Sequence, residues 1–483
     1  MNRSFVQKRI IAAAALWLTA ALLAGCSGSG DLLAGGGIGG TGATVASVGT
    51  VSGFGSVIVN SVVYDTTGAE VFVENVSKGS GDSAVAGNLL VGMVVRVEGR
   101  ISEDGSATAE RVFFSSTLKG PVESVIEPDA VSRQAVILGQ TILMDDRTAF
   151  HNVSPASLAE GMVLEVSGYD DEAGRIFATY VNKVADSLPP GGQVEIKGVV
   201  RNVIPPLERF QIRQLTVDYS AADLGGLPGN APEAGQLVKA IGQLEAMNLL
   251  AAERLELEEE FGAGVFDVVD LEGIITQAGA PAEFGIGRYT VRFDQGTSFS
   301  NLSPQDLKPG ARVVVHGPLT DRTIQADEIF LPERVRMESN AAFVDPVQNS
   351  LVLSGLETAV VFAIETTLTV GIVSVFDAIA PGDHVRVLGR RNGGDIVASI
   401  IVVTPSNDAV ELAGPVEFVS EPSIVVLGIE IDTSSIPPEG FKGPEDEPVS
   451  PEEFFGAIRL GVNVAVKGLL EGGGVNWTGI AIE

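Results

Sequence analysis

Alternating apolar positions recur at regular intervals along the chain, inside an eight-residue frame that is bounded by two glycines. The frame begins at Gly92, Gly161, Gly235, Gly310, Gly382 and Gly461, at intervals of 69, 74, 75, 72 and 79 residues. The third and fifth positions after the first glycine are apolar in every copy, as are Val95 and Val97 in GMVVRVEG. Because this period-two alternation is typical of a β-strand with one buried face, each frame predicts a strand, and its return predicts about six repeat units.

The position between those two apolar residues determines the character of the opposite face of the strand. It is occupied by Arg96, Glu165, Lys239, Val314, Arg386 and Ala465, and is therefore polar in four copies of six. We expect this face to lie mostly in water. The two glycines are expected at a tight turn before the strand and at a bulged or close-packed position after it, where a Cβ atom would clash. A phosphate-binding role for them is the less favoured interpretation.

Further strand patterns surround each frame. In the first repeat they include SVIVN and VVYD before the frame and ATAERVFF after it. The count is five strands, with a short helix or irregular link between the third and the fourth, which is the order of an OB-like barrel of about 70 residues. The sequence thus predicts an all-β chain, a tandem array of about six small five-stranded OB-like β-barrels.

Proline- and glycine-rich stretches mark the expected boundaries between the repeats. These boundaries are 1–25 for a signal segment, 26–44 for a glycine-rich tether, and 45–118, 119–188, 193–260, 265–333, 334–405 and 409–483 for repeats one to six.

The first residues have the pattern of an export signal. Three basic residues, Arg3, Lys8 and Arg9, precede an apolar stretch of about 14 residues, which is short for a membrane-spanning helix. The segment Leu23-Ala24-Gly25-Cys26 that follows resembles the lipobox of bacterial lipoproteins. An ordinary signal peptide with an incidental cysteine is the alternative.

The lipobox resemblance implies that Cys26 carries lipid, including palmitate, and becomes the first mature residue. In lipoproteins of Gram-negative bacteria an aspartate at the next position favours retention at the inner membrane. Ser27 stands there in this chain, so we expect a lipid-anchored envelope protein at the outer membrane, on its periplasmic or cell-surface side. Cys26 is the chain's single cysteine, which leaves no thiol for disulfide or redox chemistry once it is lipidated.

Charge restricts the expected partners. The chain has 31 basic and 62 acidic residues, and loss of residues 1–25 with their three basic residues would leave 28 basic residues and a formal net charge of −34. Such a surface repels nucleic acid. The tether contains eight glycines in residues 27–44, a composition typical of a flexible spacer.

The pieces GTVSGFGSVIVNSVVYDT, LLVGMVVRVEG and ATAERV of the first repeat resemble a repeat domain of exported bacterial proteins that is classed as of unknown function. The resemblance weakens through repeats three and five, where the leading glycine or the loop lengths depart from the pattern. It implies an OB-like or related small β-barrel, and it implies no activity.

Candidate catalytic and metal-ligating residues are sparse. The three histidines, His151, His316 and His384, fall in three different repeats, and none has a second histidine within helical or hairpin reach. We expect them to be hydrogen-bonded or exposed, and predict no metal, no cofactor and no catalytic residue. The sequence Gly53-Phe54-Gly55 has predicted strands on both sides, so a hairpin turn is favoured over a nucleotide-binding loop.

Acidic residues gather at Asp145-Asp146, at Asp170-Asp171-Glu172 and at Glu445-Asp446-Glu447. None of these clusters has the D-x-D-x-D-G pattern of a calcium loop, so solvated turns are favoured over weak calcium binding. A glycosidase would need two carboxylates that converge across a cleft, and sequence alone does not place them.

These observations favour a non-enzymatic, lipid-anchored cell-envelope protein whose repeats form a scaffold or a binding array for envelope proteins or polysaccharide. The alternative is a carboxylate-dependent, carbohydrate-active hydrolase of the envelope, in which one repeat would have a cleft with acids of raised pKa. A third hypothesis is a rod stabilised by calcium.

Overall fold

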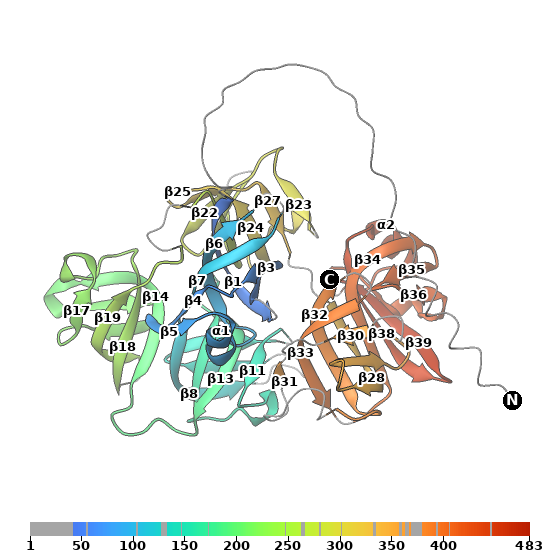
Figure 1. The fold of residues 1–483 in the computed structure, drawn as a ribbon, viewed down its shortest axis with the longest axis horizontal. Coiled ribbons are helices and arrows are strands. Elements are labelled where there is room, and N and C mark those ends of the chain that lie inside the picture. Colours follow the sequence, from blue (N-terminus) through green and yellow to red (C-terminus); the bar gives the residue numbers. More distant parts are fainter. Residues whose placement is uncertain are drawn as a thin grey trace, which may run out of the picture. The chain divides into compact units, whose positions relative to one another are not determined.

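The computed structural model of the chain describes residues 42–483, except 55–56, 103–104, 127–132, 146, 172, 247, 262–265, 280–281, 301, 332–334, 357–359, 363–366, 369–378, 393–394, 405 and 445–446. The signal segment, Cys26 and most of the tether therefore lie outside the described residues. Residues Gly42–Glu483 form one compact unit (Figure 1). Its secondary structure is mostly β-strand, which confirms the expected class.

Repeat one shows how each repeat is built. Its strands are β1 (Ala43–Gly53), β2 (Val57–Val59), β3 (Val62–Asp65), β4 (Glu70–Val73), β5 (Val76–Ser80), β6 (Val94–Ile101) and β7 (Ala107–Phe114). Pairing runs β1–β2–β3–β7–β6 and returns to β1, so five strands close a ring. Only β3–β7 is parallel within this ring. The expected short helix before the frame is α1 (Asp82–Asn88).

Repeats two and three close equivalent rings. Repeat two comprises β8 (Leu118–Ile126), β9 (Arg133–Ile137), β10 (Gln140–Met144), β11 (Ala149–His151), β12 (Val163–Asp170) and β13 (Ile176–Ala185). Repeat three comprises β14 (Val194–Ile204), β15 (Arg209–Ile212), β16 (Leu215–Asp218), β17 (Asp223–Gly226), β18 (Leu237–Ala246) and β19 (Leu249–Leu257). The parallel closures are β10–β13 and β16–β19.

Repeats four and five follow the same pairing order. Repeat four comprises β20 (Val268–Ala278), β21 (Glu283–Ile286), β22 (Tyr289–Arg292), β23 (Ser298–Ser300), β24 (Arg312–Gly317), β25 (Leu319–Thr320), β26 (Thr323–Gln325) and β27 (Glu328–Phe330). Repeat five comprises β28 (Val335–Asp345), β29 (Ser350–Leu353), β30 (Val360–Phe362), β31 (Thr367–Leu368), β32 (His384–Asn392) and β33 (Asp395–Thr404). The parallel closures are β22–β26 and β30–β33.

Repeat six departs from this order. It comprises β34 (Ala409–Ser420), β35 (Ser423–Val426), β36 (Ile429–Asp432), β37 (Phe441–Lys442), α2 (Pro451–Ala457), β38 (Asn463–Glu471) and β39 (Gly474–Ile482). Among its described residues β36 pairs with β35 only, and the parallel partner of β39 is β37. The third strand, β36, therefore does not close a ring with β39. Instead, the Ser435 hydroxyl, which lies shortly after β36, donates to the carbonyl oxygen of Trp477 in β39 at 3.1 Å.

The frame glycines have the expected roles. The first glycine has a φ between +84° and +97° in all six copies, a backbone conformation in which a side chain is strained. The second glycine lies at or beside a register shift in most copies, as at Gly99, where a Cβ atom would lie 2.0 Å from the Thr108 carbonyl oxygen. These positions are thus a turn and a bulge, as the sequence predicts.

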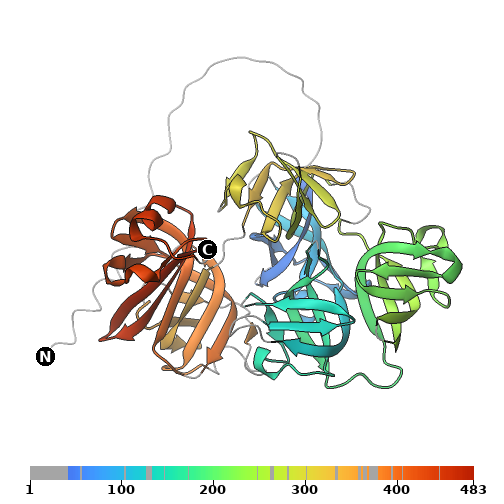
Figure 2. The ribbon, with the colours of Figure 1, turned by 180° about the vertical axis from the view of Figure 1, so that it is seen from behind.

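The first strands of the repeats join the barrels in pairs. Parallel β1–β20 pairing joins repeat one to repeat four, and antiparallel β8–β14 and β28–β34 pairing joins repeat two to three and five to six. In the amino-acid sequence, repeats two and three thus lie between repeats one and four, which pair with each other. Figures 1 and 2 show blue β1 beside the yellow strands of repeat four from both sides.

The hydrophobic cores follow this pairing. One core is shared by repeats two and three and another by repeats five and six, while Ala46 and Val48 of β1 belong to the core of repeat four. The repeats therefore do not stack strictly in chain order, as the repeats of a simple tandem array would.

Candidate functional site

The polar face of the frame strands lies largely against other residues instead of in water. The side chain of Lys239 is 1% exposed and that of Arg96 is 17% exposed, while Val314 and Ala465 are buried. The guanidinium of Arg96 lies 3.9 Å from the centre of the Phe113 ring and donates to the Glu259 carbonyl oxygen. The expectation of a mostly wet face is wrong, because a polar residue in an alternating pattern can face a charged group of another repeat as well as water.

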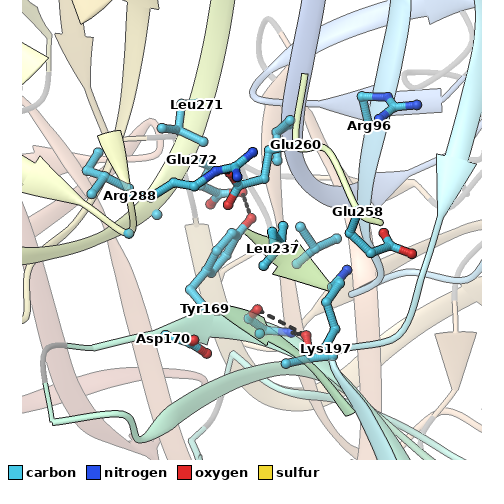
Figure 3. A pocket seen from close by; sticks show the side chains of 18 of the residues that line it. Arg96, Tyr169, Asp170, Lys197, Leu237, Glu258, Glu260, Leu271, Glu272 and Arg288 are labelled. Carbon is cyan, nitrogen blue, oxygen red and sulfur yellow. Dashed lines mark hydrogen bonds and ion pairs between the residues drawn. The ribbon is translucent and has the colours of Figure 1, made fainter. Parts of the chain in front are cut away.

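A cavity of about 180 Å³ lies where repeats one to four meet (Figure 3). Its apolar wall includes Val48, Leu237 and Leu271. Its cationic residues are Arg96, Lys197, Arg213 and Arg288, and its acidic residues are Asp170, Glu258, Glu259, Glu260 and Glu272. The frame strands, the first strands, the turns after β15 and β21 and the segment after β19 supply these side chains, so no single repeat contains the site.

Arginine–carboxylate pairs occupy much of this wall. Arg213 donates to both carboxylate oxygens of Asp170, at 2.6 Å from Nη2 and 3.0 Å from Nε, and its Nη1 donates to the Lys197 carbonyl oxygen. The Nε of Arg288 lies 2.8 Å from Glu260. These pairs connect repeat three to repeats two and four, and they involve four of the nine charged residues named around the cavity.

A buried hydrogen-bond ring lies beside the cavity and joins three repeats. Tyr169 of β12 donates to Glu272 of β20 at 2.8 Å, and its hydroxyl lies 3.0 Å from that of Thr50 in β1. Arg312 donates to Thr50 at 2.7 Å and to Glu272 at 2.8 Å, which completes the ring. Burial, and next the charge of Glu272, raise the pKa of Tyr169, so this phenol stays neutral and acts as a donor.

A second charged cluster surrounds Lys239. Its ammonium contacts Glu74 of repeat one and lies 2.8 Å from Glu195 of repeat three. Burial by itself lowers the pKa of Lys239, but the two carboxylates outweigh burial and raise it. Lys119 of repeat two lies 3.1 Å from the same Glu195, so this cluster also spans three repeats.

Lys197 differs from its neighbour. It stands opposite Lys239 in the antiparallel β14–β18 pair, and its ammonium donates to the Ser115 carbonyl oxygen at 2.7 Å. Among the described residues, no carboxylate lies within ion-pair distance of its Nζ. Burial lowers the pKa of Lys197, Glu258 opposes this effect and the charge of Lys239 adds to it. In Figure 3 its side chain points into the cavity on the side of Glu258.

The three histidines each have a hydrogen-bond partner, as expected. His151 Nε2 lies 2.9 Å from the Val91 carbonyl oxygen of repeat one, and burial lowers its pKa. His316 Nδ1 lies 2.6 Å from Asp270, a contact that raises the pKa of His316. His384 is fully buried between Asn340 and Glu338. No group of three or more potential metal ligands occurs in the described part of the chain.

The acidic clusters named by the sequence do not converge. Asp145 accepts the Arg147 backbone N–H at 2.9 Å, Asp170 binds Arg213, and Asp171 binds Arg175 at 2.7 Å. Asp146, Glu172, Glu445 and Asp446 lie outside the described residues, as does Gly55 of the glycine pair. Gly53 pairs with Ile58 across the β1–β2 hairpin, as predicted.

A carboxylic acid with a raised pKa does occur, but outside the cavity wall. It is Glu165 of the frame in repeat two, whose pKa burial raises and whose carboxylate accepts from the Tyr180 hydroxyl at 3.0 Å. Within the described ranges, no helix is long and apolar enough to cross a membrane.

Sequence reasoning named Arg96 and Asp170 but did not connect them, or the other cavity residues, with a site. Lys197, Tyr169 and Arg288 belong to three repeats and carry no motif, so nothing in the sequence links them. The one sequence signal was the polar residue between the two apolar positions of the frame, because this residue lies on a strand face that contacts another repeat.

Comparison with known proteins is consistent with the repeat architecture. The family described as "Domain of unknown function (DUF5666)" matches residues 44–112, 119–182 and 272–329, which correspond to repeats one, two and four. No curated protein matches the chain. Three of the repeats are therefore similar to one uncharacterised domain family, whose description indicates no function.

Proposed function

We propose that the protein is a non-enzymatic, lipid-anchored scaffold of the cell envelope, built from six OB-like barrels and tethered through Cys26. The observation that carries the proposal is the use of the polar frame faces. In repeat three this face holds a buried ion pair between Lys239 and Glu74 of repeat one. In repeat one Arg96 donates to the Glu259 carbonyl oxygen, so these faces contact other repeats instead of lining open, repeated binding grooves.

Buried contacts of this kind favour one defined arrangement of the repeats. A buried ion pair adds little net stability, but removal of one partner leaves an uncompensated charge. The Lys239 and Tyr169 clusters each require three repeats at once. A chain assembled in this way presents a fixed outer surface at the end of a glycine-rich tether, which suits envelope proteins or polysaccharide as partners.

Metabolic labelling with radioactive palmitate tests the anchor. We expect label on the wild-type protein, none on Cys26→Ala, and recovery of the wild type with the outer membrane. Ser27→Asp is the matched control, since it keeps Cys26 but changes the sorting position, and we expect it to stay labelled and move to the inner membrane. An unlabelled wild type recovered in the soluble fraction would contradict the proposal.

The scaffold role is tested separately, with the purified protein without its lipid. Incubation with isolated envelope polysaccharide should give retention without cleavage, or cross-linking in cells should give defined envelope-protein partners. Release of soluble oligosaccharides would instead support the hydrolase alternative and contradict this proposal.

A further inference from the structure

We propose that Lys197 is a nucleophilic amine that captures small aldehydes or ketones as an imine in the cavity among repeats one to four. This inference is independent of the proposed scaffold function. It rests on the position of Lys197, the partners of its neighbours and the size of the cavity.

The two lysines that stand opposite each other in β14 and β18 have different kinds of partner. Lys239 takes Glu74 and Glu195, whereas the Nζ of Lys197 has the Ser115 carbonyl oxygen at 2.7 Å and no described carboxylate within ion-pair distance. A carbonyl oxygen also accepts a hydrogen bond from a neutral amine, whereas a carboxylate strongly favours the ammonium form. A lysine beside another cation in a desolvated site is a recognised arrangement for an activated amine.

Two carboxylates of the cavity wall are engaged by arginines. Asp170 is held by Arg213 and Glu260 by Arg288, so neither is paired with the lysine, while Glu258 accepts from the Ser115 hydroxyl at 3.3 Å. Glu258, Glu74 and Glu260 favour the charged form of Lys197, and Lys239 opposes it, but burial is the largest influence and lowers the pKa. A larger fraction of this lysine is therefore neutral near pH 7 than of an exposed lysine.

The cavity limits the size of the carbonyl compound. Its volume of about 180 Å³ is slightly larger than the roughly 150 Å³ cavity that holds a benzene molecule in another protein. Compounds of a few carbon atoms fit this volume, and we expect slower reaction with a substituted pyridine aldehyde that carries a phosphate. The wall of the cavity also includes the apolar side chains of Val48 and Leu271.

The reaction balances without an oxidant or a reductant. The Nζ lone pair attacks the carbonyl carbon and forms a C–N bond as the carbonyl π bond opens, and a proton passes from nitrogen to oxygen. The resulting carbinolamine loses water to form the imine. One amine and one carbonyl compound thus give one imine and one water molecule.

The experiment traps the imine in the complete chain. The protein is treated at pH 7 with limiting glycolaldehyde and sodium cyanoborohydride, and the modified lysines are identified by peptide mass spectrometry. Lowering the pKa of a lysine increases its neutral, reactive fraction at pH 7. We therefore expect Lys197 to react faster than the exposed Lys78, and the ion-paired Lys239 to stay unmodified.

Three comparisons separate this result from ordinary surface chemistry. First, the ratio of Lys197 adduct to Lys78 adduct should rise as the pH falls from 9 to 7. Second, Lys197→Arg should lose the fast adduct, whereas Lys239→Arg should keep it. Third, pyridoxal phosphate should label Lys78 but not Lys197. Equal or slower labelling of Lys197 than of Lys78, or a ratio that does not change with pH, would overturn the inference. Labelling of Lys197 by pyridoxal phosphate would overturn the assignment to the cavity.

Discussion

Individual charged side chains at the contacts between repeats are stable because their partners come from elsewhere in the chain. Lys239 is almost completely buried, and it stays charged because Glu74 and Glu195 both approach it. An isolated ammonium in that position would be too costly to bury. The sequence shows only a polar residue between two apolar ones, so neither the burial nor the partners of Lys239 could be predicted.

Tyr169→Phe tests the hydrogen-bond ring. The substitution removes a hydroxyl that donates to Glu272 and lies 3.0 Å from Thr50. A hydrogen bond to a charged group contributes about 1.5–3 kcal/mol, so we expect a loss of about 2 kcal/mol in urea unfolding. Tyr219→Phe is the control, since no described residue hydrogen-bonds the hydroxyl of this buried tyrosine, and it should cost much less. Equal effects of the two substitutions would argue against the ring.

The pH dependence of His316→Gln tests the Asp270 contact. The contact with Asp270 raises the pKa of His316 in the folded state. Its contribution to the stability of the fold is therefore fully present below the unfolded pKa of about 6.5, and this contribution is lost as the pH rises through the raised folded pKa. The difference in unfolding free energy between wild type and variant should therefore shrink as the pH rises. A difference that does not change between pH 5 and pH 9 would contradict the assignment.

His151→Gln should give the opposite sign. Burial lowers the pKa of His151, so the unfolded chain binds a proton more readily and His151 destabilises the fold as the pH falls below about 6.5. The variant should therefore lose less stability than wild type on acidification, as measured by urea unfolding at several pH values. A greater acid sensitivity of the variant would show that His151 is protonated in the fold.

At the scale of single elements, the frame shows what the sequence predicts well. The alternation of apolar residues and the two glycines locate a strand, its turn and its bulge in every repeat, because all of these depend on neighbouring residues. The closed rings of repeats one to five also follow from five strands in a fixed order. The missing closure by β36 in repeat six was not predictable. The parallel partner that β39 keeps is β37, which pairs with the C-terminal part of β39 as β4 does with β7.

Gly92→Ala and Gly310→Ala separate backbone strain from the contact between repeats. Both glycines begin a frame and have a φ near +90°. A Cβ atom at Gly92 would lie 2.3 Å from the Thr179 carbonyl oxygen of repeat two, whereas one at Gly310 would meet nothing within 4 Å. We expect Gly310→Ala to cost about 1–2 kcal/mol from the backbone.

The cost of Gly92→Ala should exceed that value by roughly 1–3 kcal/mol, because the neighbouring repeat must move. Urea unfolding of both variants measures the difference. Equal costs would mean that repeat two does not pack on this turn in solution.

At the scale of the whole molecule, the order in which repeats pair cannot be deduced from their order in the chain. Repeat one pairs with repeat four through β1–β20, although two complete repeats separate them. Six similar units with similar strand edges leave many pairings open, and side chains from distant repeats decide among them. The cavity was unpredictable for the same reason, since its wall exists only once four repeats have met.

Chemical cross-linking between β1 and the segment before β20 tests this pairing most directly. The Thr44 hydroxyl donates to Asp267 at 2.8 Å, although the two residues are 223 positions apart. In a Cys26→Ala background, Thr44→Cys with Asp267→Cys should give an intramolecular link with a short bismaleimide in the folded protein and little link in urea. Each single-cysteine variant should give none. Failure of the folded double variant to link, or equal linking in urea, would contradict the pairing of repeats one and four.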